Sequence, residues 1–327
     1  MISTFYYKKG SPFETNLSRE RMVSVLMEQD GLLWLDLESP NDFEEDALVE
    51  IFNFHALAIE DCLNDRSHPK VDNYEDYLFI VMHGLVVQLA ENEKIPKLVT
   101  QELNIFLGKN YIVTFHKVPV KAVEQVRDVI NRKPEIHMSH GADLLLHSIL
   151  DHLVDNYLPV LDQYDEVIDK LEEDVFDNPS KNYLSMVMQI KRDLFSLRRT
   201  MSPQRDILNA FTHSGYQLIK PKHLIYFKDV YDHLFKIYGS IEAMHETITG
   251  LLQAYFSYSS NRLNEIMKRM TVLATLTMPS VIIASIYGMN FHNIPGLEWS
   301  YGYHTSLILM GVISIIMLIW MKWKKWI

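Results

Sequence analysis

The amide side chain of Asn290 follows a long stretch without charged residues, in the order Tyr287-Gly288-Met289-Asn290. Hard cations such as Mg²⁺ bind oxygen ligands and give up their water reluctantly. A ring of amide oxygens from several copies of the chain could therefore hold a hydrated ion without stripping it. Gly288 would permit the preceding helix to end with unusual backbone angles.

A second group of candidate residues recurs at three- and four-residue spacing before this tetrapeptide, which places them on one broad helix stripe. The members are Asn264, Met267, Met270, Ala274, Met278, Val281 and Ser285. Methionine and small residues on such a stripe more often pack against another helix than line a pore. A pore along a single-helix stripe also requires several copies of the chain. The spacing alone therefore favours packing over conduction.

Both groups lie in or next to a stretch that is long and apolar enough to cross a membrane. Residues 271–290 contain no charged side chain, and roughly 20 apolar residues span a bilayer core as a helix. A second uncharged run, 306–321, follows after a short connection. We predict spans at about 271–290 and 304–321, joined by an outer loop at 291–303.

The distribution of basic residues predicts the orientation of these spans. Lysine and arginine flank the pair of spans and are absent from the loop between them, the flanking residues being Arg262, Lys268, Arg269, Lys322, Lys324 and Lys325. Basic residues favour the cytoplasmic side, so both termini are expected in the cytoplasm and the chain in the cell membrane. A buried helical hairpin in a soluble core is the alternative, and it would leave this asymmetry unexplained.

The residues before the spans predict two further regions. Strand patterns at 32–37, 77–89, 102–108 and 110–116, a hairpin turn at 108–110, and helical spacing at 42–52 and 120–130 indicate an α/β domain over 1–140. Helical periodicity then dominates 141–270, with antiparallel helices at 143–177 and 181–199. A helix from Pro221 to Asn290 would be ~105 Å long at ~1.5 Å per residue. It would connect the cytoplasmic domain to the membrane domain, 271–327, as a stalk.

Several classes of protein are disfavoured. The net charge of −11 argues against a nucleic-acid partner. Phosphate-loop and nucleophile-elbow motifs do not occur, and Thr249 replaces the second histidine of an HExxH pattern at His245, so we expect no enzyme. The single cysteine, Cys62, excludes a disulfide within the chain. The acidic segment 151–177 is either a solvated helix face or a concentrator of cations near a conduction path.

The chain resembles the CorA family of magnesium channels in three features of its C-terminal part. These are residues 287–290 at the end of the first of two spans, the short proline-containing loop, and the lysine-rich tail. The resemblance covers most of the chain, is weakest over the first 50 residues, and extends through segments 58–81, 226–234 and 261–279 and the surroundings of Asp151. It implies an α/β cytoplasmic domain, a long stalk helix and two C-terminal transmembrane helices, assembled as a homopentamer. The stalk would continue into the pore-lining span.

The resemblance also implies roles for individual residues. Gly288, Met289 and Asn290 would form the outer selectivity ring, and the stripe from Asn264 to Ser285 would line the pore, with constrictions at Met267, Met270 and Met278. Regulatory divalent cations would bind at Glu60, Asp61, Asp151, Asp229 and His233. Independently of the family, Asp229 and His233 are four residues apart on a predicted helix and so share one face.

The implied function is Mg²⁺ influx through a homo-oligomer in the lipid bilayer, closed by intracellular Mg²⁺, with Co²⁺ or Ni²⁺ as possible further cargo. The outer loop departs from the common family pattern because Gly296 replaces a glutamate and Glu298 is the only acid. A less negative mouth lowers the local cation concentration. Two alternatives stay open: a zinc or other transition-metal transporter of the same fold, and a tail-anchored scaffold or sensor without transport.

Overall fold

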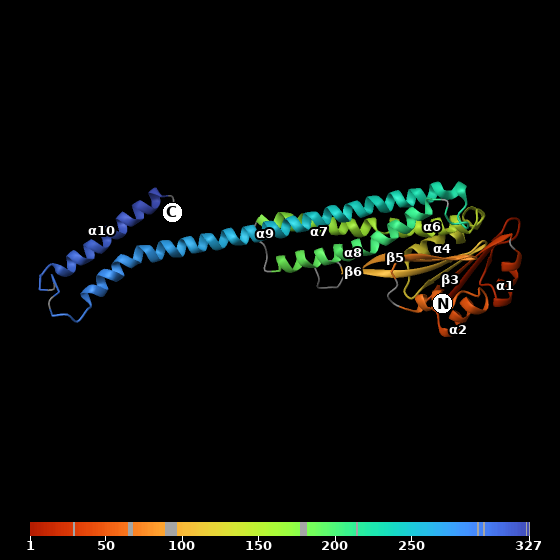
Figure 1. Cartoon of the computed structure of the whole chain (residues 1–327), viewed down its shortest axis with the longest axis horizontal. Helices are drawn as coiled ribbons and strands as arrows, with labels where there is room; N and C mark the ends of the chain where they lie inside the picture. Colours follow the sequence, from red (N-terminus) through yellow and green to blue (C-terminus); the bar gives the residue numbers. More distant parts are fainter. Residues whose placement is uncertain are drawn as a thin grey trace. The chain divides into compact units, whose positions relative to one another are not determined.

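The computed structural model describes the chain except residues 29, 65–67, 89–96, 177–181, 214, 293, 297, 325 and 327. The described residues form two compact units, Met1–Leu252 and Gln253–Ile327. One helix, α9 (Leu224–Tyr287), contributes residues to both units (Figure 1). The predicted domain boundaries after residues 140 and 270 stay predictions.

A seven-stranded mixed sheet organises the first unit, with the strand order β2-β1-β3-β7-β6-β5-β4. Its strands are β1 (Ile2–Lys8), β2 (Glu14–Thr15), β3 (Gly31–Glu38), β4 (Lys70–Tyr74), β5 (Tyr77–Gln88), β6 (Lys97–Leu107) and β7 (Tyr111–His116). β3 pairs with β7 in parallel, with Leu35 opposite Val113, and the other neighbouring strands pair antiparallel. β3 and β7 therefore end at the same edge of the sheet.

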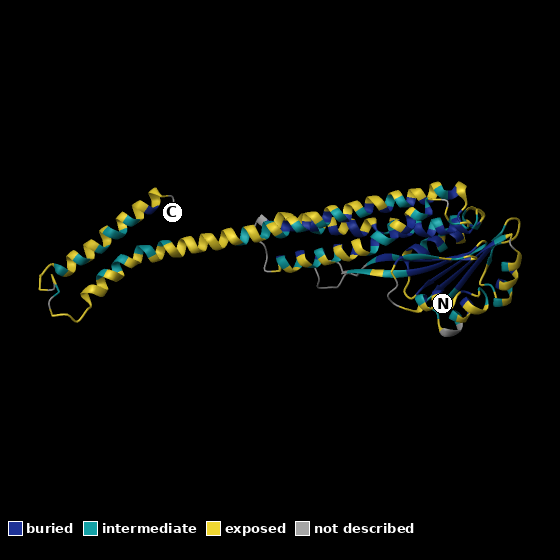
Figure 2. Cartoon of the chain, viewed as in Figure 1, coloured by how far each residue is buried: buried dark blue, intermediate teal, exposed yellow. Residues whose placement is uncertain are grey.

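Helices cover both faces of this sheet. On one face, α1 (Arg19–Glu28), α2 (Asp42–Glu50) and α3 (Ala56–Leu63) bury an aromatic and aliphatic core with Leu35, Phe79 and Phe106. On the other face lie α4 (Lys121–Arg132) and α6 (Ala142–Asp155), whose apolar residues at three- and four-residue spacing are buried. The dark-blue strands in Figure 2 show that the central part of the sheet is buried, while its edge strands are partly exposed. Burial of this apolar surface is what stabilises the unit.

The remaining helices of the first unit are α5 (Pro134–His137), α7 (Leu158–Phe176) and α8 (Tyr183–Phe211), followed by a 3₁₀ turn (Pro221–His223) and the first part of α9. α7 and α8 run antiparallel, as predicted. The Tyr164 hydroxyl donates to Asp193 at 3.0 Å, and the Tyr183 hydroxyl donates to the Leu171 carbonyl at 3.1 Å. The long helices α7, α8 and α9 follow the sheet and α6 in the sequence (Figure 1).

The structure corrects three sequence expectations. The helix predicted over 143–177 is two helices, because the chain breaks at Asn156 and Tyr157. The Tyr157 side chain is buried and its hydroxyl donates to the His83 carbonyl of β5, which holds the break against the sheet. The partner helix predicted to end at Arg199 continues to Phe211. The stalk helix ends at Tyr287 instead of Asn290.

The strands predicted at 32–37 and 110–116 and the hairpin turn at 108–110 are confirmed. The backbone N–H of Gly108 donates to the Tyr111 carbonyl at 3.0 Å to close the hairpin. The sequence expectation missed β1, β2 and β4. β2 has only two residues, and β4 is a polar edge strand, so neither has an apolar run. In β1, buried positions are filled by Ser3 and Thr4, which hide the pattern.

The second unit is a helical hairpin made by the end of α9 and by α10 (Gly302–Trp323). Among the described residues, α9 and α10 are the two helices long and apolar enough to cross a membrane, with mean hydropathies of 1.7 and 2.1 over the most apolar window. The Ser314 hydroxyl donates to the Leu276 carbonyl at 3.4 Å, which joins the two helices. Most of the side chains in this unit are exposed (Figure 2).

Candidate ion pathway and cation sites

The predicted stripe lies on the side of α9 that α10 leaves uncovered. All its members are exposed, from Asn264 to Ser285, including Met267 at 65%, Met270 at 62% and Met278 at 63%. The half-buried residues of the same segment are Val272, Thr275, Leu276, Pro279, Ser280 and Ile283. Their spacing puts them on roughly the opposite face of the helix. The stripe therefore does not pack against the second helix of its own unit.

The C-terminal end of α9 carries the tetrapeptide with the candidate selectivity residues. The Gly288 N–H donates to the Ala284 carbonyl at 3.0 Å, and the Met289 N–H donates to the Ile286 carbonyl at 3.3 Å. Asn290 is exposed directly beyond this last turn. The amide therefore stands at the end of the helix that carries the stripe.

Glycine at 288 has a different role from the one expected. Its backbone does not adopt a left-handed conformation, whereas that of Gly296 does, with φ +91°. A Cβ at Gly288 would lie 3.2 Å from the Ala284 carbonyl oxygen, which is a tight contact. Glycine thus lets the chain leave the helix close to the last carbonyl groups, without unusual backbone angles.

The loop after Asn290 folds back onto the start of α10. The Trp299 N–H donates to the Gly296 carbonyl at 3.3 Å, and the Gly302 N–H donates to the Trp299 carbonyl at 2.9 Å. A Cβ at Gly302 would lie only 2.5 Å from the Gly296 oxygen, so only glycine fits the position without a shift of the backbone. The loop therefore has a defined turn at the end of the hairpin.

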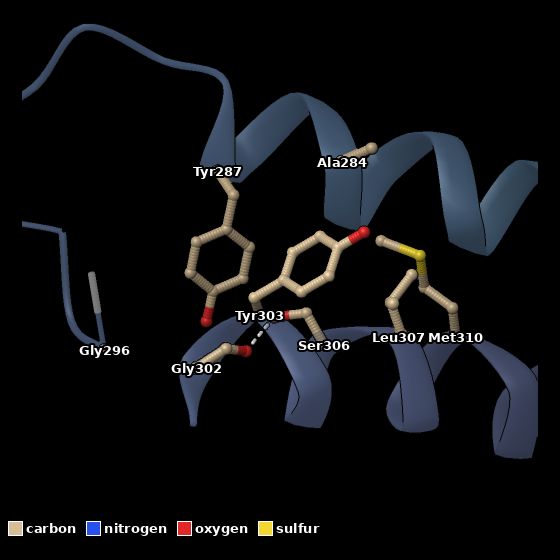
Figure 3. A pocket seen from close by; sticks show the side chains of 8 residues that line it. All are labelled: Ala284, Tyr287, Gly296, Gly302, Tyr303, Ser306, Leu307 and Met310. Carbon is tan, nitrogen blue, oxygen red and sulfur yellow. Dashed lines mark hydrogen bonds between the residues drawn. The ribbon is translucent and has the colours of Figure 1, made fainter. Parts of the chain in front are cut away.

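Next to this turn, α9 and α10 enclose an apolar cavity of about 460 Å³. Tyr287, Tyr303 and Met310 point into it from the two helices (Figure 3). The lining holds hydroxyls and aliphatic or aromatic surface but no carboxylate, so it has no ligand set for a divalent cation.

The other end of the hairpin is basic and aromatic. Lys268 and Arg269 of α9 line one cavity together with Glu265, Val272 and Trp326. Lys268 and Arg269 precede the apolar part of α9, and Trp326 belongs to the tail after α10. These two segments therefore lie at the same end of this unit. Basic and aromatic side chains at one end of an apolar hairpin are typical of a membrane–water interface.

Three of the five predicted regulatory residues come together in the first unit. Candidate ligand atoms of Asp151 on α6 and of Asp229 and His233 on α9 all lie within 4.8 Å of one another. Burial raises the pKa of the Asp151 carboxyl, while the nearby His147 acts to lower it. Two carboxylates and one imidazole converging from two helices form a suitable partial ligand set for a divalent cation.

The other two predicted regulatory residues lie on α3, away from this group. Glu60 is exposed, and Asp61 accepts a hydrogen bond from the Lys70 ammonium at 2.6 Å. Lys70 also pairs with Asp72 at 2.6 Å. Among the residues the structure describes, neither Glu60 nor Asp61 belongs to the metal-ligand group of its own chain. The resemblance implies that regulatory cations bind at these five residues between cytoplasmic domains, and that assignment stays a prediction.

A second cluster of titratable groups, which the sequence analysis missed, lies where the parallel strands β3 and β7 end. Asp36, Glu38 and His116 bring ligand atoms within 4.8 Å of one another. Asp36 accepts from His116 Nε2 at 3.1 Å and from the Thr114 hydroxyl at 2.6 Å, and Arg127 of α4 lies 3.9 Å from both carboxylates. Polar residues inside two otherwise apolar strands were the available sequence indication.

The bonding of this second cluster marks it as an internal ion network. His116 Nδ1 faces the Val118 carbonyl at 2.8 Å while Nε2 faces Asp36, so both ring nitrogens must donate and the imidazole is charged. Burial lowers the pKa of His116, but the hydrogen bond and charge of Asp36 outweigh it, and the pKa is raised. The positive charges of His116 and Arg127 then balance the negative charges of Asp36 and Glu38. Because both ring nitrogens of His116 carry a proton, the ring has no lone pair for a metal ion.

The acidic segment lies partly along a groove between α7 and α9. Asp162, Asp165, Asp169 and Glu172 line one cavity of about 340 Å³ on the α7 side. All four carboxylates are exposed. Their spacing keeps them on one helix face, which fits a solvated surface, and a role in concentrating cations stays a prediction.

Comparison with known proteins identifies relatives over almost the whole chain. The family model described as CorA-like Mg²⁺ transporter protein matches residues 29–324. The cobalt/magnesium transport protein CorA of Thermotoga maritima is 38% identical over 268 residues, which cover 82% of this chain and 75% of that protein. The putative metal ion transporter YfjQ of Bacillus subtilis is 36% identical over 285 residues, covering 86% of each chain.

A solved structure shares the fold. The complete structure of the CorA magnesium transporter from Methanocaldococcus jannaschii matches with a TM-score of 0.84 and 22% sequence identity, covering 100% of this chain and 99% of that one. The predicted architecture, an α/β domain followed by a long helix and a C-terminal apolar helix, is thereby confirmed.

Proposed function

Because the chain belongs to the family of CorA-like Mg²⁺ transporter proteins, we propose that it forms a homopentameric channel that conducts Mg²⁺ into the cytoplasm. The family consists of transporters rather than enzymes, and the chain is a membrane protein. The observation that carries the proposal is the stripe on α9, whose members are all exposed and face away from α10. Copies of α9 arranged around an axis would turn this stripe into the wall of a pore.

In the proposed pore, Asn290 and the methionines of the stripe have different roles. A ring of Asn290 amides at the outer mouth binds hydrated Mg²⁺, because amide oxygens can accept hydrogen bonds from its water shell. Rings of Met267, Met270 and Met278 farther along are apolar, and a narrow apolar ring closes a pore when water leaves it. Selection and closure are therefore separated along one helix.

Closure by intracellular Mg²⁺ would act through the cation group on α6 and α9. Glu60 and Asp61 do not reach Asp151, Asp229 and His233 within one chain. We propose that they meet this group across the boundary between neighbouring subunits. A divalent ion held there offsets the repulsion of the carboxylates and favours the symmetric, closed assembly. Loss of the ion lets like charges separate the subunits, and the apolar constriction can then fill with water.

The proposed topology has two spans and a cytoplasmic N- and C-terminus in the cell membrane. It is supported by the basic and aromatic end of the hairpin, where Lys268, Arg269 and Trp326 line one cavity. The exposed face of α10, with Ile308 at 66%, Ile315 at 57% and Ile319 at 65%, would contact lipid. The loop with Asn290 would then face the outside.

Cobalt is a second candidate cargo, because the name of the Thermotoga maritima relative includes it. The outer loop of this chain has Glu298 as its only acidic residue, so the mouth attracts cations weakly and without a set of soft ligands. Competition between Mg²⁺ and Co²⁺ or Zn²⁺ during uptake distinguishes the cargoes.

Cysteine cross-linking tests whether the stripe faces the axis of an assembly. The only cysteine, Cys62, is buried, so one introduced thiol reports on its own position. In membranes treated with an oxidant, Met278→Cys should give disulfide-linked dimers, because the same residue of neighbouring subunits meets near the axis. Ile315→Cys is the matched control, since it is similarly exposed and faces away from α9 on α10. Equal cross-linking of both variants, or cross-linking of Ile315→Cys alone, would contradict the proposed pore.

A further inference from the structure

The tail after α10 returns to α9 at the basic end of the hairpin. Met321, near the end of α10, is the one buried side chain among the described residues of the second unit. The Trp326 N–H donates to the Met321 carbonyl at 2.9 Å, which holds the backbone of the tail against the helix end. Trp326 thereby lies next to α9 and lines a cavity of about 430 Å³. The other lining residues are Glu265, Lys268, Arg269 and Val272.

This cavity lies on the face of α9 opposite the stripe. Glu265, Arg269 and Val272 follow one another at four- and three-residue spacing, so they share one helix face. The same face continues into Leu276 and Pro279, which are half-buried on the side of α9 that α10 covers. A ligand in the cavity would therefore lie on the outer side of the hairpin, where the membrane is, and away from the proposed pore.

The basic side chains at this cavity are available to a ligand. Lys268 has no acidic partner within the part of the chain that the structure describes. Arg269 Nη2 lies 3.9 Å from Glu265 Oε2, which is too far for a hydrogen bond. Guanidinium and ammonium groups are the usual protein partners of phosphate, and the fork of an arginine can donate two parallel hydrogen bonds to it.

The remaining lining is apolar and aromatic. Val272 belongs to the apolar part of α9, and a tryptophan ring is suited to the boundary between headgroups and hydrocarbon. Positive charge, an aromatic ring and aliphatic surface follow one another in the order of the phosphate, the glycerol region and the acyl chains of a phospholipid. Clusters of basic residues directly beside a membrane-spanning helix attract anionic lipids.

We propose that this cavity binds an anionic phospholipid, with its phosphate on Lys268 and Arg269 and the start of its acyl chains against Val272 and Trp326. The proposed topology, on which this inference rests only for the choice of leaflet, puts the lipid in the cytoplasmic leaflet. Inorganic phosphate has no apolar part to contact Val272, and a zwitterionic headgroup carries its own cation. The bound lipid contacts both α9 and the tail after α10, so it joins the two spans at their inner ends.

Native mass spectrometry of the purified full-length protein tests the inference without measuring transport. The protein is equilibrated with equal amounts of phosphatidylglycerol and phosphatidylcholine, and the retained lipids are counted. We expect phosphatidylglycerol to be preferred. The double variant Lys268→Gln, Arg269→Gln should lower this preference by about tenfold or more, since each basic side chain beside an anionic lipid contributes roughly fivefold. The double variant Lys228→Gln, Lys236→Gln removes the same charge from exposed positions of α9 in the first unit and should keep the preference.

The outcomes separate this inference from the proposed function. A preference for phosphatidylglycerol that is lost with Lys268 and Arg269 and kept in the control variant supports the inference. Equal retention of the two lipids by wild type, or the same preference in both double variants, overturns it. Displacement of phosphatidylglycerol by inorganic phosphate also overturns it, because the site would then recognise the anion alone. A protein that conducts Mg²⁺ without this lipid preference refutes the inference and leaves the channel standing.

Discussion

The two compact units differ in what covers their apolar side chains. In residues 1–252 the chain buries its own core, and Trp34, Phe79 and Phe106 are each 0% exposed. In residues 253–327 the large apolar side chains face outward, as with Met278 at 63% and Ile315 at 57% (Figure 2). Soluble monomers rarely expose contiguous apolar surfaces of this kind. The first unit buries its own core, whereas the exposed apolar surface of the second unit agrees with the proposed contacts to lipid and to further copies of the chain.

This difference separates the expected effects of substitutions. Changes in the first unit act on its folding or on ion binding at its surface, because its contacts are made within the chain. Changes on the uncovered face of the second unit should leave the fold of one chain intact and act on the proposed conduction.

Substitution of Asn290 should remove transport. Asn290→Ala deletes the amide oxygen proposed to bind hydrated Mg²⁺, and Asn290→Asp replaces it with a charge that holds the ion too strongly or alters selection. We expect Mg²⁺ uptake to be abolished or grossly altered in both, with unchanged amounts of assembled protein. Fluorescent measurement of Mg²⁺ uptake, with gel filtration as the control for assembly, checks this. Near-normal flux and selectivity in both variants would remove Asn290 from the ion pathway.

Met278→Asp should produce a leak. A carboxylate in the apolar constriction keeps water in the pore, so the channel should conduct even at high internal Mg²⁺. The side chain is exposed in the single chain, so its replacement should not disturb the hairpin. Uptake is measured at equal membrane abundance of wild type and variant. If the variant conducts no better than wild type, Met278 packs against another subunit instead of closing the pore.

The double variant Asp61→Ala, Asp229→Ala should lose the protection from proteolysis that Mg²⁺ gives. This effect is expected to be smaller than those of the two preceding substitutions. An ion that binds the closed assembly stabilises it by mass action, so ~mM Mg²⁺ should slow proteolysis of the first unit. The double variant should lose this protection and show raised flux at high internal Mg²⁺. Asp206→Ala, which changes an exposed acid on α8, serves as the control and should keep the protection. Digestion that is the same with and without Mg²⁺ in every sample would remove the sensor from the account.

The ion network of Asp36 and His116 predicts a modest pH dependence of folding. The pKa of His116 is raised in the folded chain, so its contribution to stability is complete below the unfolded value of about 6.5. That contribution is lost as the pH rises through the higher folded pKa. Urea unfolding of the first unit should therefore become easier above about pH 6.5, and His116→Gln should flatten this dependence. An identical pH dependence in wild type and variant would contradict a charged His116.

The elements with strong periodicity could be predicted from the sequence. The strand at 32–37 and the apolar spans have patterns that local physics determines, and both are found close to the expected residues. The break at Tyr157 could not be predicted, because it depends on a contact with the His83 carbonyl from a distant strand. The helix over 143–177 was for this reason predicted as unbroken.

The candidate sites also divide into those that local spacing predicts and those that depend on contacts between distant segments. Asp229 and His233 share a helix face by spacing alone, and the structure brings Asp151, which the family resemblance had named, next to them from α6. The pairing of Asp36 with His116 depends on the parallel register of β3 and β7, which the sequence does not reveal. Glu60 and Asp61 came from family resemblance, and a single chain does not bring them to the other three residues.

The central claim is that the second unit, assembled from copies of this chain, is a pathway for Mg²⁺. The most direct test is Mg²⁺ flux into liposomes that contain only the purified full-length protein and a Mg²⁺-sensitive dye. We expect uptake down an imposed gradient that is blocked by internal Mg²⁺ and absent with Asn290→Ala. Liposomes with correctly inserted, oligomeric protein that take up Mg²⁺ no faster than empty ones would contradict the claim.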